Sequence, residues 1–222
     1  MVPASATTAS VAPKPELRGV SHQVAFFLAA VGTMALVRLA HPGVQRWCTA
    51  VFGGSLVVLF GVSALYHRVR WRPRALRWMR RLDHSAVLVA MAGGFTPLFA
   101  LVPSTRGGHG ALAVIWIGAG IGVLRAFVWP DAPPWIVVAV SVAVGWACAG
   151  QVVDRLASVG PWIIGSFVAS GLLYTIGGGV LATKRPDPLP RLFGYHEVFH
   201  AFVVAGTATL FAHVAMLLRS AP

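Results

Sequence analysis

The sequence predicts an all-α membrane protein with seven transmembrane helices and a cytoplasmic N-terminus. Of its 222 residues, 57% are hydrophobic and 11% are charged, and the mean hydropathy is +0.74. A water-soluble domain of this length carries far more charge. The apolar residues also fall into seven runs, each close to the ~20 residues that a ~30 Å hydrocarbon core requires. The composition therefore indicates a polytopic membrane protein.

Short connections separate the seven runs and contain Pro, Gly and charged residues, which end helices. Residues 1–18 are rich in Ala, Ser, Thr and Pro and lack the apolar core of a signal peptide, so they predict a disordered cytoplasmic tail. Residues 19–222 then form one seven-helix domain, because the connections leave no room for a soluble one. The expected spans are 20–40, 49–66, 84–103, 110–128, 135–153, 161–182 and 196–218.

The basic residues predict the orientation of the chain. Eighteen Lys and Arg against six Asp and Glu would suit a nucleic-acid partner, but seven of the Arg lie between positions 68 and 81, in one connection. Lys184, Arg185 and Arg191 lie in another connection of the same parity. The positive-inside rule therefore places the N-terminus in the cytoplasm and predicts no nucleic-acid partner. The Arg-rich connection is also expected to contact anionic lipid headgroups.

Three histidines are candidate metal ligands. His196 and His200 lie four residues apart at the start of the last span, so a helix projects them from one face, about 5–6 Å apart. His67 ends the second span, and the alternating direction of the helices brings it to the same cytoplasmic side. Three neutral imidazoles around Zn²⁺ leave a fourth position for water, as in catalytic zinc sites. The alternative is a set of core histidines satisfied by hydrogen bonds.

Asp83 and Ser63 are the candidate catalytic residues beside these ligands. Asp83 lies at the expected start of the third span, and Ser63 lies one turn before His67 on the same face. Asp83 could take the proton of a zinc-activated water, and Ser63 could hydrogen-bond the substrate carbonyl or the aspartate. Alternatively, Asp83 caps the third helix or pairs with Arg80 or Arg81. Ser63 could equally bond a carbonyl of its own helix.

Three further histidines are expected to lie outside the site. His84 follows Asp83 but points about 100° away on a helix, so it is expected at the membrane interface. His213 lies near the outer end of the last span, too far along the axis to share a metal with His196. His22 lies at the end of a segment, where an exposed imidazole needs no role.

A second motif overlaps the histidine pair. The run His196-Glu197-Val198-Phe199-His200 matches H-E-x-x-H, in which the glutamate acts as general base of a metalloprotease. On that interpretation the chain is an intramembrane metalloprotease, and Leu82-Asp83-His84 is the only sequence comparable to the distant aspartate motif of such proteins. If the chain is not a protease, Glu197 either holds one of the histidine ligands in place or is an acidic residue at the membrane interface.

Three motifs together resemble the hemolysin III family, which belongs with the progestin and adipoQ receptors, including the adiponectin receptors. They are Ser63-Ala64-Leu65-Tyr66-His67, Leu82-Asp83-His84-Ser85, and the run from Phe193 to His200. The resemblance covers all seven expected spans. It implies a seven-helix fold with zinc held by His67, His196 and His200, with Asp83 bonded to the zinc water and Ser63 beside it.

The resemblance also implies a function. The wider superfamily is similar to alkaline ceramidases, so the implied chemistry is zinc-dependent hydrolysis of a lipid amide, here in a bacterial plasma membrane. The second hypothesis is a non-catalytic membrane sensor or homeostasis protein, in which zinc clamps three helices together. The metalloprotease is the third, and the related receptors argue against it because they have Gln where this chain has Glu197.

Overall fold

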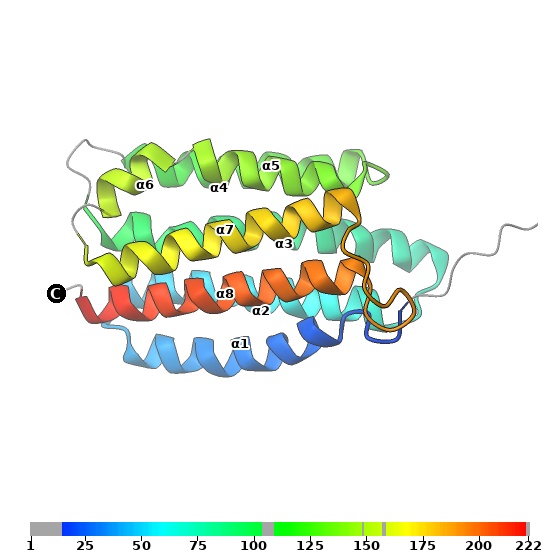
Figure 1. Cartoon of the computed structure of the whole chain (residues 1–222). Helices are drawn as coiled ribbons and strands as arrows, with labels where there is room; N and C mark the ends of the chain where they lie inside the picture. Colours follow the sequence, from blue (N-terminus) through cyan, green and yellow to red (C-terminus); the bar gives the residue numbers. More distant parts are fainter. Residues whose placement is uncertain (1–14, 104–108, 148, 157–158, 221–222) are drawn as a thin grey trace, which may run out of the picture.

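The computed structural model describes residues 15–103, 109–147, 149–156 and 159–220. Regular structure in this part of the chain is helical, apart from one isolated bridge between Leu189 and Phe193. The helices lie side by side along a common axis (Figure 1). They are α1 (Val20–Leu39), α2 (Val44–Arg68), α3 (Pro73–Leu101), α4 (His109–Val128), α5 (Pro134–Ala147), α6 (Ala149–Leu156), α7 (Pro161–Thr183) and α8 (Tyr195–Ser220).

The all-helical membrane architecture is confirmed. Within the described residues, six helices are long and apolar enough to cross a membrane, namely α1, α2, α3, α4, α7 and α8. The expected fifth span, 135–153, is occupied by α5 and α6, between which residue 148 lies outside the described part. Seven spans and a cytoplasmic N-terminus therefore stay predictions.

The second and third helices begin earlier than the hydropathy pattern predicts. α2 starts at Val44 instead of residue 49, and α3 starts at Pro73 instead of residue 84. Proline suits the first turn of a helix, where its missing N–H leaves no bond unmade. The Arg-rich segment is thus largely helical, and the prediction of a connection reaching to Asp83 is wrong. Because α3 begins ten residues before it, Asp83 is not a helix cap.

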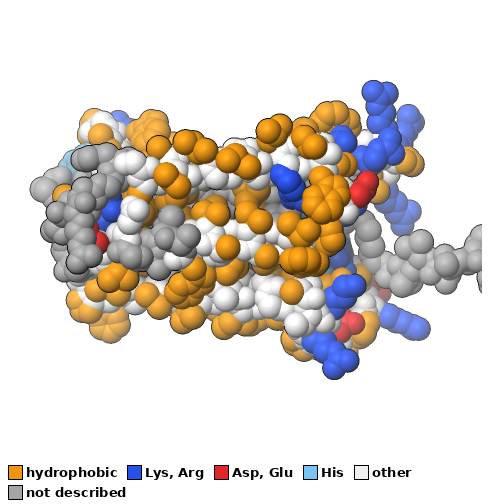
Figure 2. All heavy atoms as spheres, turned by 90° about the horizontal axis from the view of Figure 1, so that it is seen from above, with side chains coloured by type: hydrophobic (Ala, Val, Ile, Leu, Met, Phe, Trp, Pro, Cys, Tyr) orange, Lys and Arg blue, Asp and Glu red, His pale blue; other side chains and the backbone are white. Residues whose placement is uncertain are grey.

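The surface has the character expected of a protein that faces lipid. Apolar side chains on α1 and α4 are strongly exposed, among them Leu28, Val31, Ile117 and Ile121. Figure 2 shows hydrophobic atoms over the visible flank of the bundle, with most Lys and Arg gathered at one end. Exposed tryptophans occur near both ends of the helices, where aromatic belts form; they are Trp47, Trp78, Trp129, Trp135 and Trp162.

Consecutive helices pack against each other, and α8 closes the bundle. α2 lies between α1 and α3, α3 also contacts α4, and α8 contacts α7, α1 and α3. One core cluster is built around Phe52, Leu56 and Phe60 of α2 together with Val214 of α8. This packing brings the start of α8, the end of α2 and the start of α1 to the same end of the molecule (Figure 1).

The described chain begins against the connection between α7 and α8. The backbone N–H of Glu16 donates to the carbonyl of Arg191 at 3.0 Å, and that of Leu17 donates to Leu192 at 3.2 Å. Residues 1–14 of the expected tail lie outside the described part, so disorder there stays a prediction. Residues 15–18 have defined contacts, which place Arg18 beside the start of α8.

Candidate metal centre

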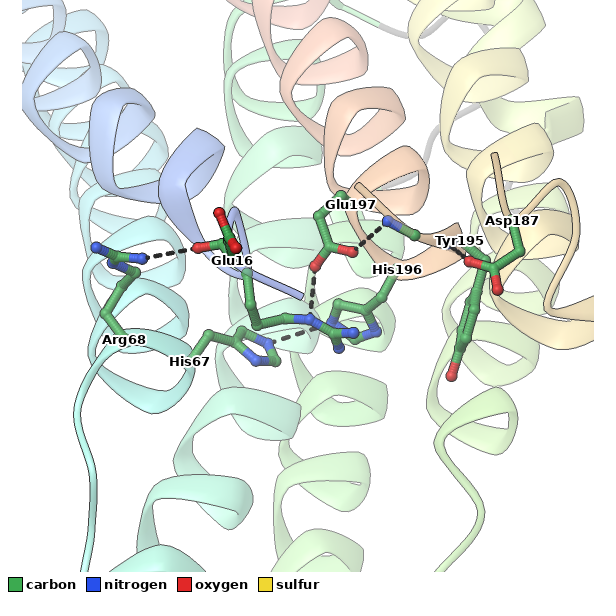
Figure 3. A network of polar contacts seen from close by, with 9 residues as sticks. Glu16, His67, Arg68, Asp187, Tyr195, His196 and Glu197 are labelled. Atoms are coloured by element: carbon green, nitrogen blue, oxygen red, sulfur yellow. Dashed lines mark hydrogen bonds and ion pairs between the residues drawn. The ribbon is translucent and has the colours of Figure 1, made fainter. Parts of the chain in front are cut away.

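The start of α8 is fixed by two carboxylates, and this sets the direction of His196 and His200. The first N–H groups of a helix lack partners inside the helix. Here the N–H of Gly194 donates to Glu197 Oε2 at 2.9 Å, and the N–H of Tyr195 donates to Asp187 Oδ1 at 2.8 Å (Figure 3). The bond from Glu197 back to the residue before the helix is one half of a capping box.

His67, His196 and His200 form one cluster. One ring nitrogen of each lies within 4.8 Å of those of the other two. Nε2 of His67 and Nε2 of His196 are 3.3 Å apart (Figure 3), and the ring centroids of the three pairs are 4.5 to 5.0 Å apart. The three rings come from α2 and α8, and His67 and His196 are 129 residues apart in the sequence. The three histidines could therefore hold a single metal ion.

The distances within the cluster suit a small divalent metal. Two nitrogens bound to Zn²⁺ at about 2.0–2.1 Å with tetrahedral angles are about 3.3–3.4 Å apart. The separation of 3.3 Å between His67 and His196 already has that value. Nε2 of His67 and Nε2 of His196 are also within hydrogen-bond distance of each other, as the interpretation of the histidines as a hydrogen-bonded core requires. His200 is 2% exposed, and a metal bound to one of its ring nitrogens would compensate the cost of burying this polar ring.

His22 is a member of the site that the sequence pattern missed. It was expected to be an exposed imidazole at a segment end, but it is only 3% exposed. Its ring stacks on that of His200, with centroids 3.7 Å apart and an interplanar angle of 6°. Its Nδ1 lies 2.8 Å from the Ser63 hydroxyl. The signal was the position of His22 in the first turn of α1, which enters at the same end as the other histidines.

A glycine allows α1 to begin this close to the histidine cluster. Gly19, the residue before α1, has a φ of 79°, in the left-handed region that favours glycine. A Cβ atom at this position would lie 2.7 Å from Cβ of His67. Any other residue at position 19 would therefore push the start of α1, and with it His22, away from α2.

Glu197 is engaged in structural contacts. It is buried, its Oε2 accepts the N–H of Gly194, and its Oε1 forms an ion pair with Nε of Arg18. Both oxygens are thus directed at the helix start and the N-terminal segment (Figure 3). A general base of the H-E-x-x-H type must instead contact the metal-bound water. These contacts support the interpretation of Glu197 as a residue that holds the start of α8, and with it His196 and His200, in place.

Asp83 and Ser63 lie with two of the ligands on one cavity. The cavity has a volume of about 370 Å³, and its polar end is lined by His22, Ser63, Asp83, His84, His196 and His200. The Asp83 carboxyl interacts with the Ser63 hydroxyl, which also contacts His22. The Ser63 hydroxyl therefore contacts residues of α1 and α3, and its role is not only to bond a carbonyl of its own helix. His84 lines the same cavity, so its expected position at the interface, facing away from the site, is wrong.

The arginines that were considered as partners of Asp83 have other contacts. Arg80 pairs with the exposed Asp131, with 3.4 Å between the charged atoms. The guanidinium of Arg81 lies over the ring of Trp78, 4.9 Å from its centroid. Asp83 instead faces the cavity. The structure therefore favours the interpretation of Asp83 as part of the site.

The comparisons with known proteins agree with these motifs. A family described as "Haemolysin-III related" matches residues 11–211. The chain is 26% identical to "Hemolysin-3" of Bacillus cereus over 167 residues, which cover 72% of this chain and 70% of that protein. It is 25% identical to "Hemolysin-3 homolog" of Bacillus subtilis (strain 168) over 197 residues, covering 86% and 88%. With nearly its whole length matched by one family, the chain is a member of the haemolysin-III-related proteins.

Proposed function

We propose that this protein is a zinc-dependent hydrolase that cleaves lipid amides within the membrane. The observation that carries the proposal is one mostly apolar cavity, which is lined by two of the three clustered imidazoles together with the carboxylate of Asp83 and the hydroxyl of Ser63. A purely structural metal site has no need of an adjoining cavity. A site for a lipid needs both the polar end and the apolar extension.

Zinc is the metal that we assign to His67, His196 and His200. Three neutral imidazoles with a free fourth position are the donor set of catalytic zinc sites. Bound there, zinc would supply Lewis acidity, which lowers the pKa of a coordinated water towards ~7 and polarises a carbonyl oxygen.

Asp83 and Ser63 perform the proton and hydrogen-bond steps of the proposed reaction. Asp83 accepts a proton from the attacking water while the oxygen of that water forms a bond to the amide carbonyl carbon. Ser63 donates its one hydroxyl hydrogen to Asp83 and so orients the carboxylate towards the attacking water. The proton held by Asp83 then passes to the amide nitrogen as the C–N bond breaks. The products are a fatty acid and an amine.

The apolar part of the cavity supports an acyl chain as the bound group. The rest of the wall is formed mainly by aliphatic and aromatic side chains of α3, α5, α6, α7 and α8, and it also includes Ser141, Ser170 and Thr175. An acyl chain placed there would exchange the apolar surroundings of the bilayer for those of the cavity, so its binding depends on packing against the wall and not on removal from water. The lining includes Met91, Phe95, Val142, Phe167, Val168 and Val203.

The proposed topology has seven spans with the site in the cytoplasmic half of the plasma membrane. α5 and α6 together supply the fifth span, and the Arg-rich end of the bundle faces the cytoplasm. Alkaline phosphatase fused after Pro222 is then expected to be active, because an odd number of spans places the C-terminus outside. Activity of this fusion only in lysed cells would contradict the topology.

Hydrolysis is tested with the purified protein in lipid nanodiscs. Wild-type protein loaded with zinc is expected to release fatty acid from an amide lipid. Asp83→Asn is expected to keep its zinc and lose turnover by at least about 100-fold, as removal of a general base does. Asp131→Asn changes an exposed aspartate and serves as the control. Equal turnover in Asp83→Asn and wild type would contradict the mechanism.

A non-catalytic protein with structural zinc is the second candidate. It is favoured by the way the cluster and its neighbours connect α1, α2 and α8 through His22, His67 and His200. On this hypothesis, removing zinc lowers thermal stability, and Asp83→Asn leaves every biological activity intact. Release of fatty acid by zinc-loaded wild type, lost in Asp83→Asn, would exclude it.

A further inference from the structure

His22 is a buried histidine beside the metal ligands that the proposed chemistry does not use. Its ring is 3% exposed and lies parallel to that of His200, 3.7 Å from centroid to centroid. Among the residues that the structure describes, its Nε2 has no hydrogen-bond partner. Burial of a polar ring without full hydrogen bonding costs free energy, so its presence here calls for a compensating role.

The ring of His200 lacks the support that metal-binding histidines usually have. Such a ligand normally donates its second ring N–H to a carboxylate, carbonyl or water, which fixes the orientation of the ring. Nδ1 of His200 is buried and has no hydrogen-bond partner in the described part of the chain. Ring contacts must therefore set its orientation, and the parallel contact with His22 is closer than the tilted contact with Phe199, at 5.6 Å.

His22 is itself firmly held. Nδ1 lies 2.8 Å from the Ser63 hydroxyl, and the edge of the ring contacts Phe60 at 5.1 Å between centroids, with an interplanar angle of 71°. The backbone is fixed three residues earlier, where Gly19 packs against His67. The ring of His22 is thus a rigid surface anchored to α2, the helix that supplies the first metal ligand.

We propose that His22 is a positioning residue that holds the His200 ring in the orientation required for metal binding. The flat face of His22 restricts rotation of the His200 ring about its side-chain bonds, so less freedom is lost when the metal binds. The role requires a flat ring at position 22 more than it requires a ring nitrogen. This inference rests on the proposed metal site but does not depend on catalysis.

Two substitutions separate the flat ring from the hydrogen bond. His22→Leu keeps an apolar side chain in the core but removes the flat face, and His22→Phe keeps the face but removes the bond to Ser63. His213→Leu is the matched control, because His213 is fully buried on α8 and is not part of the cluster. Gel filtration and thermal unfolding of each variant with a metal chelator present establish that it folds.

The readouts are zinc affinity, measured by competition with a chromophoric chelator, and the visible absorption of the Co²⁺-loaded protein. His22→Leu is expected to bind zinc about 10–100-fold more weakly than wild type, the usual effect of losing a residue that orients a ligand. Its Co²⁺ spectrum is expected to change. His22→Phe is expected to stay within about 3-fold of wild type, well below that 10–100-fold range, and His213→Leu is expected to match wild type.

Wild-type affinity in His22→Leu, or equal losses in His22→Leu and His22→Phe, would overturn the positioning role while leaving the proposed function intact. Equal losses would assign the effect to the hydrogen bond with Ser63 instead of the ring face. Wild-type protein that binds neither zinc nor Co²⁺ would overturn the proposed function and this inference with it.

Discussion

The two ends of α8 bury histidines in different surroundings. At the first end, His200 meets the rings of His67 and His196, and its Nδ1 has no hydrogen-bond partner. At the other end, His213 is fully buried, and its Nδ1 donates to the backbone carbonyl of Ile163 at 3.0 Å, while its Nε2, like Nδ1 of His200, has no hydrogen-bond partner among the described residues. Nδ1 of His213 also lies 3.4 Å from the Ser166 hydroxyl, and the neighbouring ring is that of Phe167, at 5.1 Å.

This difference shows what distinguishes a buried histidine in a site from one in a core. A backbone carbonyl can only accept, so His213 Nδ1 carries the proton and the ring is fixed by ordinary core contacts. His200 lies among further ring nitrogens, which neutral imidazoles cannot all satisfy by bonding one another. Within the described residues, the group of three potential ligands occurs at the first end. A shared cation is the partner that satisfies several ring nitrogens at once.

The largest effect is expected from the same substitution made at each end of α8. His200→Leu removes a ligand, so the zinc content of the purified protein is expected to fall from one equivalent to nearly none. His213→Leu is expected to retain one equivalent, because its ring contacts a carbonyl and a phenyl ring. Metal analysis after exhaustive desalting provides the measurement. Equal zinc content in both variants would show that the cluster does not bind the metal.

Zinc is also expected to stabilise the fold through the first end only. Free zinc at 100 times its dissociation constant adds about 2.7 kcal/mol to the free energy of unfolding. The midpoint of thermal unfolding is therefore expected to rise with zinc and fall with chelator in wild type and in His213→Leu. It should not respond in His200→Leu. A response of the same size in all three proteins would place the stabilising zinc elsewhere.

The ion pair beside the cluster gives a smaller effect that tests the role of Glu197. Glu197→Gln leaves Arg18 largely buried without its partner, and we expect a loss of about 2 kcal/mol in stability. The double variant Arg18→Gln with Glu197→Gln no longer buries an unpaired charge. It is therefore expected to recover part of the stability, and part of the zinc affinity, that Glu197→Gln loses. The metalloprotease hypothesis predicts differently: Glu197→Gln abolishes turnover, and the second substitution restores nothing.

The smallest effect is expected from the charges on the surface of the first end. Arg74 and Arg77 are exposed on the first turns of α3, and each is expected to add about 1 kcal/mol of attraction to anionic headgroups. Arg74→Gln with Arg77→Gln should therefore reduce the stabilisation that anionic lipids give in nanodiscs. Arg46→Gln with Arg219→Gln, at the opposite end, is the control. Equal effects of the two pairs would contradict the lipid contact.

The local rules of sequence pattern were enough to predict that His67, His196 and His200 cluster at one end of the bundle. His196 and His200 share a helix face because of their spacing, and His67 reaches the same layer because successive helices alternate in direction. The same reasoning brought Ser63 and Asp83 to the cavity. These residues lie inside the expected apolar runs or, like His67 and Asp83, directly beside one, and hydropathy and length determine the helix type and direction there.

The residues at the ends of the apolar runs were harder to place. Hydropathy marks only the part of a helix inside the hydrocarbon core, so the polar first turns of α3, before Asp83, were assigned to a connection. For the same reason His22 was treated as an exposed end residue, although it is buried in the first turn of α1. The contact of Arg18 with Glu197 depends on the path of the chain before α1, and no periodicity in the sequence encodes that path.

Anomalous X-ray scattering at the zinc absorption edge, from crystals of the zinc-loaded protein, tests the central claim most directly. One peak is expected at about 2.0–2.1 Å from a ring nitrogen of each of His67, His196 and His200. A peak bound to other residues, or no peak in protein that contains one equivalent of zinc, would contradict the account.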